Sequence, residues 1–134
     1  MITLEDVNKM RAEAERLQLS GRELLNNTEL VMSECNGIGA EWMGFMAGVI
    51  SKLHPSCVIA AHIHDLRYYI GGDEIDRLRA DAEFLANCLI LIYCRYKWYD
   101  PRRYIALHTA IKFFFLVRTG GRFSWTSQKQ KGGE

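Results

Sequence analysis

The middle of the chain holds four residues whose types and spacing suit acid–base chemistry: His64, Asp65, Tyr68 and Asp81. A carboxylate beside an imidazole keeps the ring in one tautomer and stabilises the imidazolium that forms when the ring takes a proton. Tyr68 lies four residues after His64, on the same helical face, where its hydroxyl can donate to Asp81. The pattern predicts a histidine that acts as a general base.

A Gly-Gly turn has to bring this histidine and the distant aspartate together. His64 lies 7 positions before Gly71, and Asp81 lies 9 positions after Gly72. At about 1.5 Å rise per residue, the two side chains are roughly 10 and 13 Å from the turn. Helices joined by so short a loop lie antiparallel, so we expect His64 and Asp81 to meet across the pair. Pairing of Asp81 with Arg77 or Arg79 on the helix surface is the alternative.

Asp65 needs a different role, because one residue of α-helix turns its side chain about 100° away from His64. A carboxylate in that position can ligate a cation, and Ca²⁺ prefers oxygen ligands. Upstream, the stretch CNGIGAEWM (residues 35–43) has two glycines spaced by one residue. Such glycines let backbone carbonyls converge on a ligand. These two features together predict a calcium site.

The elements that position these residues read as helices, because apolar side chains recur at helical spacing and no convincing strand pattern occurs. Helices are expected from residue 4 to near Ser20, from residue 41 to Pro55, and at residues 56–70, 74–96 and 102–118. Thr3 with Asp6 resembles a capping box, and Asp73 is a natural N-cap. The fourth helix is expected to bury an apolar stripe of Ile75, Leu78, Ala82, Leu85, Leu89 and Ile92.

The length of 134 residues is that of one domain. The sequence predicts an all-α protein whose two central antiparallel helices carry the site. Within the single domain 1–134, we expect an N-terminal helical extension at 1–34, a core at 35–118 and a mobile tail at 119–134. Cysteines are scattered without a CxxC pair, which argues for reduced thiols in apolar positions and against a zinc site.

Two short motifs resemble a known family. HDLRY (residues 64–68) and RADAEF (residues 79–84) resemble the core helices of the phospholipase A2 superfamily, in the short form of parvovirus capsids and related bacterial or phage proteins. NGIG (residues 36–39) is similar to the calcium loop of that family. The resemblance covers about residues 35–118 and implies calcium-dependent hydrolysis of the sn-2 ester of a phospholipid.

The resemblance also implies roles for individual residues. His64 would activate water, Asp81 would orient His64, and Tyr68 would support Asp81. The ligands of Ca²⁺, which polarises the ester carbonyl, would be Asp65 and the backbone carbonyls of Cys35, Gly37 and Gly39. The chain departs from the pattern in that Cys35 stands where many members have tyrosine, and Arg67 and Arg79 bring positive charge near the predicted calcium site.

Two rival functions come from the same residues. The stretch HIHD suggests a metal-dependent phosphohydrolase, but His62 and His64 project about 200° apart on a helix and cannot share one ion. The other rival is a catalytically inactive helical protein, a structural or accessory component of phage or prophage type that uses the same fold for binding.

Charge is distributed unevenly along the chain. Residues 1–94 hold 8 Lys/Arg against 14 Asp/Glu, whereas residues 95–134 hold 9 against 2. A basic and aromatic end suggests an anionic partner, either a phospholipid surface or nucleic acid, although no nucleic-acid motif is present. Packing against the acidic half of the chain, or against a protein partner, is the alternative.

The aromatic residues of this end can take either of two roles. KFFFLVR (residues 112–118) is more typical of a buried helix than of an interfacial one. The alternative is a lipid-facing rim of Trp98, Tyr99, Phe123 and Trp125, beside the basic residues Arg95, Lys97, Arg102 and Arg103.

Location follows from the apolar patterning. The charged N-terminus lacks the apolar run of a secretory signal, and no run approaches the roughly 20 residues that span a bilayer. We therefore expect a cytoplasmic protein, or one of a virion or host cytoplasm, that is neither secreted by a signal peptide nor membrane-spanning.

Overall fold

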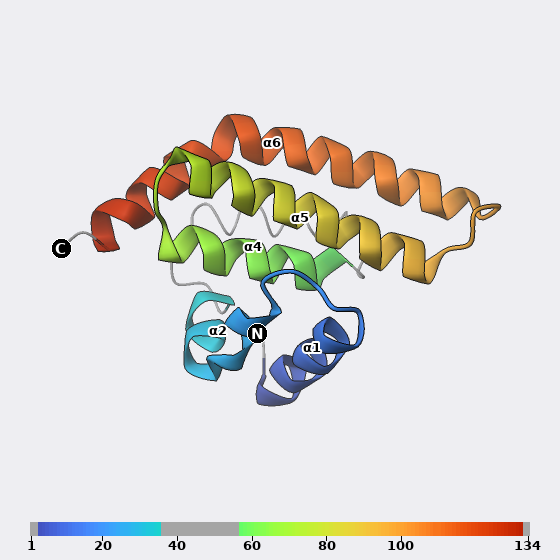
Figure 1. Ribbon diagram of the computed structural model, residues 1–134, viewed down its shortest axis with the longest axis horizontal. Helices are drawn as coiled ribbons and strands as arrows, with labels where there is room; N and C mark the ends of the chain where they lie inside the picture. Colours follow the sequence, from blue (N-terminus) through green and yellow to red (C-terminus); the bar gives the residue numbers. More distant parts are fainter. Residues whose placement is uncertain (1–2, 36–56, 133–134) are drawn as a thin grey trace.

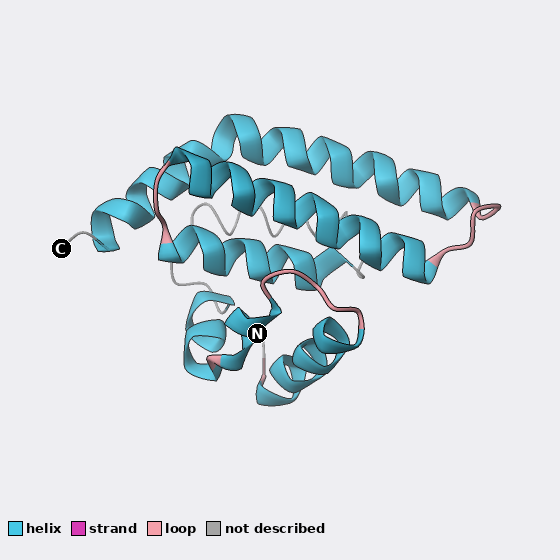
Figure 2. Cartoon of the chain, in the orientation of Figure 1, coloured by secondary structure: helices cyan, strands magenta, loops and turns pink. Residues whose placement is uncertain are grey.

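The computed structural model describes residues 3–35 and 57–132, and every regular element within these two ranges is helical (Figure 1, Figure 2). The elements are α1 (Leu4–Arg16), the short 3₁₀ helix η1 (Arg22–Asn26), α2 (Thr28–Cys35), α4 (Val58–Ile70), α5 (Glu74–Arg95) and α6 (Pro101–Gly132). The prediction of an all-α fold is confirmed. The helix expected between residue 41 and Pro55 lies outside the described residues.

Helix α1 begins at the predicted capping box. The Thr3 hydroxyl accepts a hydrogen bond from the Asp6 backbone N–H at 3.1 Å, and the Asp6 carboxylate accepts one from the Thr3 N–H at 2.9 Å. Two of the N–H groups that a helix leaves without partners at its start are thereby satisfied. The helix ends at Arg16, earlier than expected, and Gly21 then adopts a left-handed φ of 83°.

The turn between α4 and α5 needs both of its glycines. Gly71 and Gly72 have φ of 77° and 141°, a region that side chains with a Cβ rarely adopt. A Cβ on Gly72 would clash with a carboxylate oxygen of Asp76. Asp73 then caps α5 by accepting from the Asp76 N–H at 2.8 Å, as predicted. The turn reverses the chain, so α4 and α5 lie antiparallel (Figure 1).

The N-terminal elements belong to the same hydrophobic core as the later helices. Asn87 on α5 binds the segment between α1 and η1 through two hydrogen bonds. Its buried amide accepts from the Ser20 N–H at 3.0 Å and donates to the Ser20 carbonyl at 2.9 Å. The buried side chains that the N-terminal elements contribute are Val7, Met10, Ala14, Leu19, Leu25 and Val31. The predicted division of the domain into extension, core and tail stays a prediction.

Helix α5 does not bury the predicted apolar stripe in its first half. Ile75 and Leu78 are 60% and 48% exposed. The buried face instead carries Arg77, Ala80, Asp81, Phe84, Asn87, Cys88, Leu91 and Ile92. Apolar periodicity missed this face because its polar members bond to α4, to α6 and to the segment that follows α1, which removes the cost of their burial.

Helix α6 does not end at Arg118, and this prediction is wrong. The helix continues through Gly120 and Gly121 to Gly132 and crosses the end of α4 (Figure 1). Gly121 permits the crossing, because a Cβ there would lie 2.6 Å from the Tyr68 hydroxyl oxygen. Trp125, one turn later, is 4% exposed. The segment expected to be a tail is therefore helical as far as Gly132.

Within the described ranges, no helix is both long and apolar enough to cross a bilayer. In the same ranges, Cys57 and Cys88 fill buried positions as predicted, whereas Cys94 is exposed.

Candidate active site

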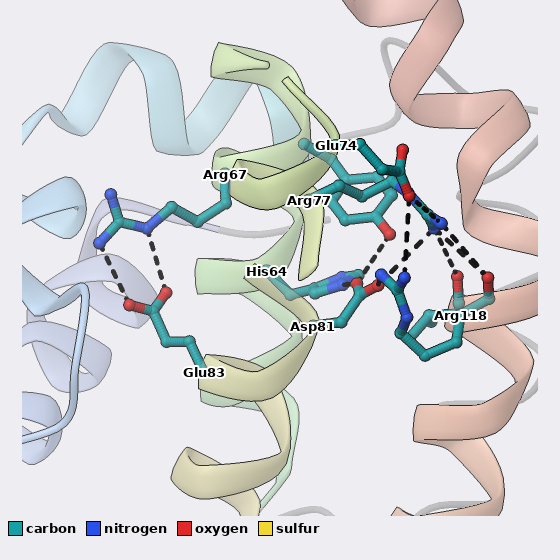
Figure 3. Close-up of polar contacts among 9 residues, drawn as sticks. His64, Arg67, Glu74, Arg77, Asp81, Glu83 and Arg118 are labelled. Atoms are coloured by element: carbon teal, nitrogen blue, oxygen red, sulfur yellow. Dashed lines mark hydrogen bonds and ion pairs between the residues drawn. The ribbon is translucent and has the colours of Figure 1, made fainter. Parts of the chain in front are cut away.

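His64 and Asp81 meet across the antiparallel pair (Figure 3). The Nε2 atom of His64 lies 2.7 Å from Oδ1 of Asp81, which confirms the predicted contact. His64 is 2% exposed and Asp81 is fully buried. The alternative of an Asp81 that lies on the helix surface is thereby excluded.

Tyr68 completes the predicted group. Its hydroxyl donates to the same Oδ1 atom at 2.7 Å, and its ring centroid lies 4.3 Å from that of His64. Burial, followed by the charge of Asp81, raises the pKa of Tyr68 well above its ordinary value. The phenol therefore keeps its proton at any physiological pH and remains a donor to the carboxylate.

The second oxygen of Asp81 faces two arginines. Arg118 on α6 donates to Oδ2 at 2.7 Å, and Nη1 of Arg77, one turn before Asp81, lies 3.7 Å from Oδ2. Arg77 is only 4% exposed. Its guanidinium also donates to Glu74 at 2.6 Å and to the carbonyl of Val117 at 3.3 Å, so it links the start of α5 to α6 (Figure 3).

These partners determine the protonation of the site. Burial alone raises the pKa of Asp81, but hydrogen bonds from His64, Tyr68 and Arg118 outweigh it and hold that pKa below its ordinary value. An ionised carboxylate only accepts hydrogen bonds, so Nε2 of His64 must carry the proton that it donates. The basic lone pair of the neutral ring is then on Nδ1.

Aromatic rings enclose this end of the helices. The ring centroid of Phe84 lies 5.3 Å from that of His64, and the ring centroid of Phe113 on α6 lies 4.8 Å from that of Phe84. Trp125 packs edge-on against Tyr68 at 5.0 Å and donates its indole N–H to the Gly72 carbonyl at 3.2 Å. Because Asp81 is fully buried, the charges around it interact more strongly than they would at the surface.

The predicted calcium ligands are only partly within the described residues. Asp65 is on α4 and is 8% exposed, and Cys35 is the last residue of α2. Gly37 and Gly39 lie outside the described residues. In the ranges that are described, no three His, Cys, Asp or Glu residues form a group that could hold a metal ion. The calcium site stays a prediction, for which Asp65 supplies one buried carboxylate.

Arg67, which the sequence places near the predicted calcium site, is paired within the protein. It donates to both carboxylate oxygens of Glu83 at 3.1 Å (Figure 3), and Glu23 lies 3.4 Å away. Its positive charge is therefore balanced by carboxylates on α5 and η1. Burial lowers the pKa of His62, so this ring is neutral at physiological pH.

Sequence reasoning missed Arg118 and Trp125 as parts of the site and placed Arg77 wrongly. Arg118 and Trp125 lie far along the chain from Asp81, and no local pattern places α6 beside the Gly-Gly turn. Arg77 had a signal, because it precedes Asp81 by four residues on one helix face. That spacing was interpreted as a surface pair, whereas both partners are buried.

No family model, curated protein or solved structure matches the chain. The resemblance to the phospholipase A2 superfamily therefore rests on the short motifs of the sequence.

Proposed function

We propose that the chain is a hydrolase of phospholipase A2 type, in which His64 activates water for attack on a phospholipid ester. One observation supports the proposal above all others. Asp81 is fully buried, and its Oδ1 atom lies 2.7 Å from both His64 Nε2 and the Tyr68 hydroxyl. A histidine held in this way has one tautomer, and its free nitrogen is the basic one.

The chemistry assigned to these residues is a proton relay. Nδ1 of His64 takes a proton from water as the water oxygen bonds to the ester carbonyl carbon. Asp81 stabilises the resulting imidazolium, and Tyr68 keeps the carboxylate in place. The imidazolium then returns its proton to the alkoxide that leaves as the C–O bond breaks. The products are a fatty acid and a lysophospholipid.

The proposed hydrolysis uses Ca²⁺ as a cofactor. When bound, the ion would polarise the ester carbonyl and stabilise the negative charge on its oxygen. Asp65 would be a ligand, with the backbone carbonyls of Cys35, Gly37 and Gly39 as the others implied by the resemblance. Removal of calcium with a chelator is expected to abolish hydrolysis and leave the helical content unchanged, as circular dichroism would show.

The test is hydrolysis of phosphatidylcholine liposomes with calcium or with a chelator, followed as released fatty acid. His64→Asn is expected to lower the rate by at least about a hundredfold, because it removes the general base. His108→Asn, on the exposed face of α6, is the matched control and should retain the wild-type rate. Activity that persists in His64→Asn would refute the mechanism.

A second candidate function is a non-catalytic helical module, a structural or accessory protein of the cytoplasm or of a phage particle. The observation that favours it is the enclosure of the group, since His64 is 2% exposed and two arginines face Asp81. In that case the group serves the stability of the fold. Lack of hydrolysis by the folded wild-type protein, with and without calcium, would support this candidate over the enzyme.

A further inference from the structure

The turn between α5 and α6, at the opposite end of α5 from Asp81, exposes large aromatic side chains. Trp98 and Tyr99 are 72% and 62% exposed. Neighbouring Tyr93, Tyr104 and Ile105 are also at least half exposed. With the basic residues Arg95, Lys97, Arg102 and Arg103, these five side chains form what we call the cationic tip. Large rings at such exposure are unusual on a surface without a partner.

The charge of the tip is strongly positive. Four cations stand within residues 95–103 against one carboxylate, Asp100, which pairs with Arg102 at 2.7 Å. The cations lie over the rings. The Arg103 guanidinium is 4.0 Å from the centroid of Tyr93, and the Lys97 ammonium is 5.9 Å from that of Tyr99. Apolar and cationic groups therefore occupy one surface and can meet one partner together.

The backbone of the tip is held by hydrogen bonds. The Asp100 N–H donates to the Lys97 carbonyl at 2.9 Å, and the Arg103 N–H donates to the Asp100 carbonyl at 3.0 Å. The Tyr104 hydroxyl donates to the Trp98 carbonyl. Because the turn is already ordered, Trp98 and Tyr99 lose little backbone freedom when they bind a surface.

We propose that the cationic tip binds the surface of an anionic lipid bilayer. Trp and Tyr are enriched at the headgroup level of membranes, where a ring can be apolar on its faces and hydrogen-bonded at its edge. Arginine and lysine beside them attract lipid phosphates. Self-association through this surface is disfavoured, because two cationic tips that faced each other would repel.

The tip is separate from the proposed active site. Tyr96, the C-cap of α5, lies fifteen positions after Asp81, which is about 22 Å at the rise of an α-helix. The sequence had grouped Trp125 with Trp98 and Tyr99 in one rim. This grouping is wrong for Trp125, which is 4% exposed and bonded to Gly72 at the other end of α5. Binding through the tip does not depend on hydrolysis.

The first test is co-sedimentation with phosphatidylcholine vesicles that contain or lack phosphatidylglycerol, in calcium-free buffer. The wild type is expected to sediment with the anionic vesicles and to stay in the supernatant with the neutral ones. The double variant Trp98→Ser, Tyr99→Ser should bind at least about tenfold more weakly. Its matched control is Ile75→Ser, Leu78→Ser, which removes two exposed apolar side chains from the other end of α5.

The second test concerns charge. Lys97→Gln, Arg103→Gln should weaken binding by about tenfold, because each cation near an anionic surface contributes favourably. Lys9→Gln, Arg79→Gln removes the same charge from exposed positions elsewhere and should have a smaller effect. Added salt should weaken the binding of the wild type to anionic vesicles. It should have less effect on the binding of the Lys97→Gln, Arg103→Gln variant.

Three results would overturn the proposal: no binding to anionic vesicles, equal binding to neutral ones, or equal loss in tip and control variants. Self-association that is lost with Trp98 and Tyr99, without vesicle binding, would assign the tip to a second copy of the chain. Hydrolysis of a short-chain phospholipid below its micelle concentration separates the two proposals, since tip variants should retain it and His64→Asn should not.

Discussion

The two ends of α5 use the same residue types in opposite ways. At the start of the helix, Arg77, Tyr68 and Trp125 are buried around the Asp81 carboxylate. At its end, in the cationic tip, Trp98 and Tyr99 are exposed, and Arg102 and Arg103 stack on tyrosine rings. The distal half of α6 covers the start of α5 (Figure 1). The end of α5 leads directly into the turn to α6. Burial, more than residue type, decides what these side chains do.

The difference has an energetic consequence. A buried ion group is costly to disturb, because a charge that loses its partner remains away from water. An exposed pair such as Asp100 with Arg102 is screened by solvent and contributes little. We therefore expect substitutions at the Asp81 end to change stability, and those at the cationic tip to change binding.

The largest effect is expected for Asp81→Asn. The amide brings N–H donors toward Arg118 and removes the buried negative charge that both arginines face, which should lower the free energy of unfolding by about 3–5 kcal/mol at pH 7. Urea denaturation measures the change. Asp100→Asn is the control at the other end, where the pair is exposed and no comparable loss is expected. Equal losses at both ends would contradict the comparison.

The same variant has a pH signature. The pKa of Asp81 is lower in the folded protein than in the unfolded chain. Its contribution to stability is therefore complete above the unfolded value of about 3.9 and is lost as the pH falls through the folded pKa. Asp81→Asn should reduce the fall in unfolding free energy below about pH 4, measured by denaturation at a series of pH values.

The next effect compares two tryptophans. Trp125→Ala removes a buried ring that packs on Tyr68, which should lower the free energy of unfolding by about 3 kcal/mol. Trp98→Ala, at 72% exposure, should leave stability nearly unchanged. Thermal unfolding by circular dichroism gives both values. If Trp125→Ala unfolded like the wild type, the distal half of α6 would not pack against Tyr68 in solution.

The smallest effect compares two adjacent glycines of α6. Gly121→Ala should destabilise by about 1–3 kcal/mol, because the new Cβ meets the Tyr68 hydroxyl oxygen at 2.6 Å. Gly120→Ala has no atom within 4 Å of its Cβ and should stabilise the helix by up to about 1 kcal/mol. Chemical denaturation measures both. Changes of the same sign would contradict the close approach of α6 to Tyr68.

Local patterns predicted much of the hairpin. The glycines at 71 and 72, the N-cap Asp73 and the counts of residues on each side of the turn were enough to place His64 opposite Asp81. Tyr68 followed from its helical spacing. The buried face of α5 was mispredicted, because Arg77 and Asp81 are buried with hydrogen-bond partners on α4, α5 and α6, and polar residues do not show in an apolar stripe.

The sequence by itself determined the antiparallel pair and the contact of His64 with Asp81, since the rise of a helix and the reach of a short turn are local properties. Only the tertiary structure decided that α6 continues past Arg118, that Arg118 bonds to Asp81, and that Trp125 closes the group. These contacts join residues about forty positions apart or more. They depend on where α6 crosses α4. That crossing is possible because Gly121 has no Cβ that would clash with Tyr68.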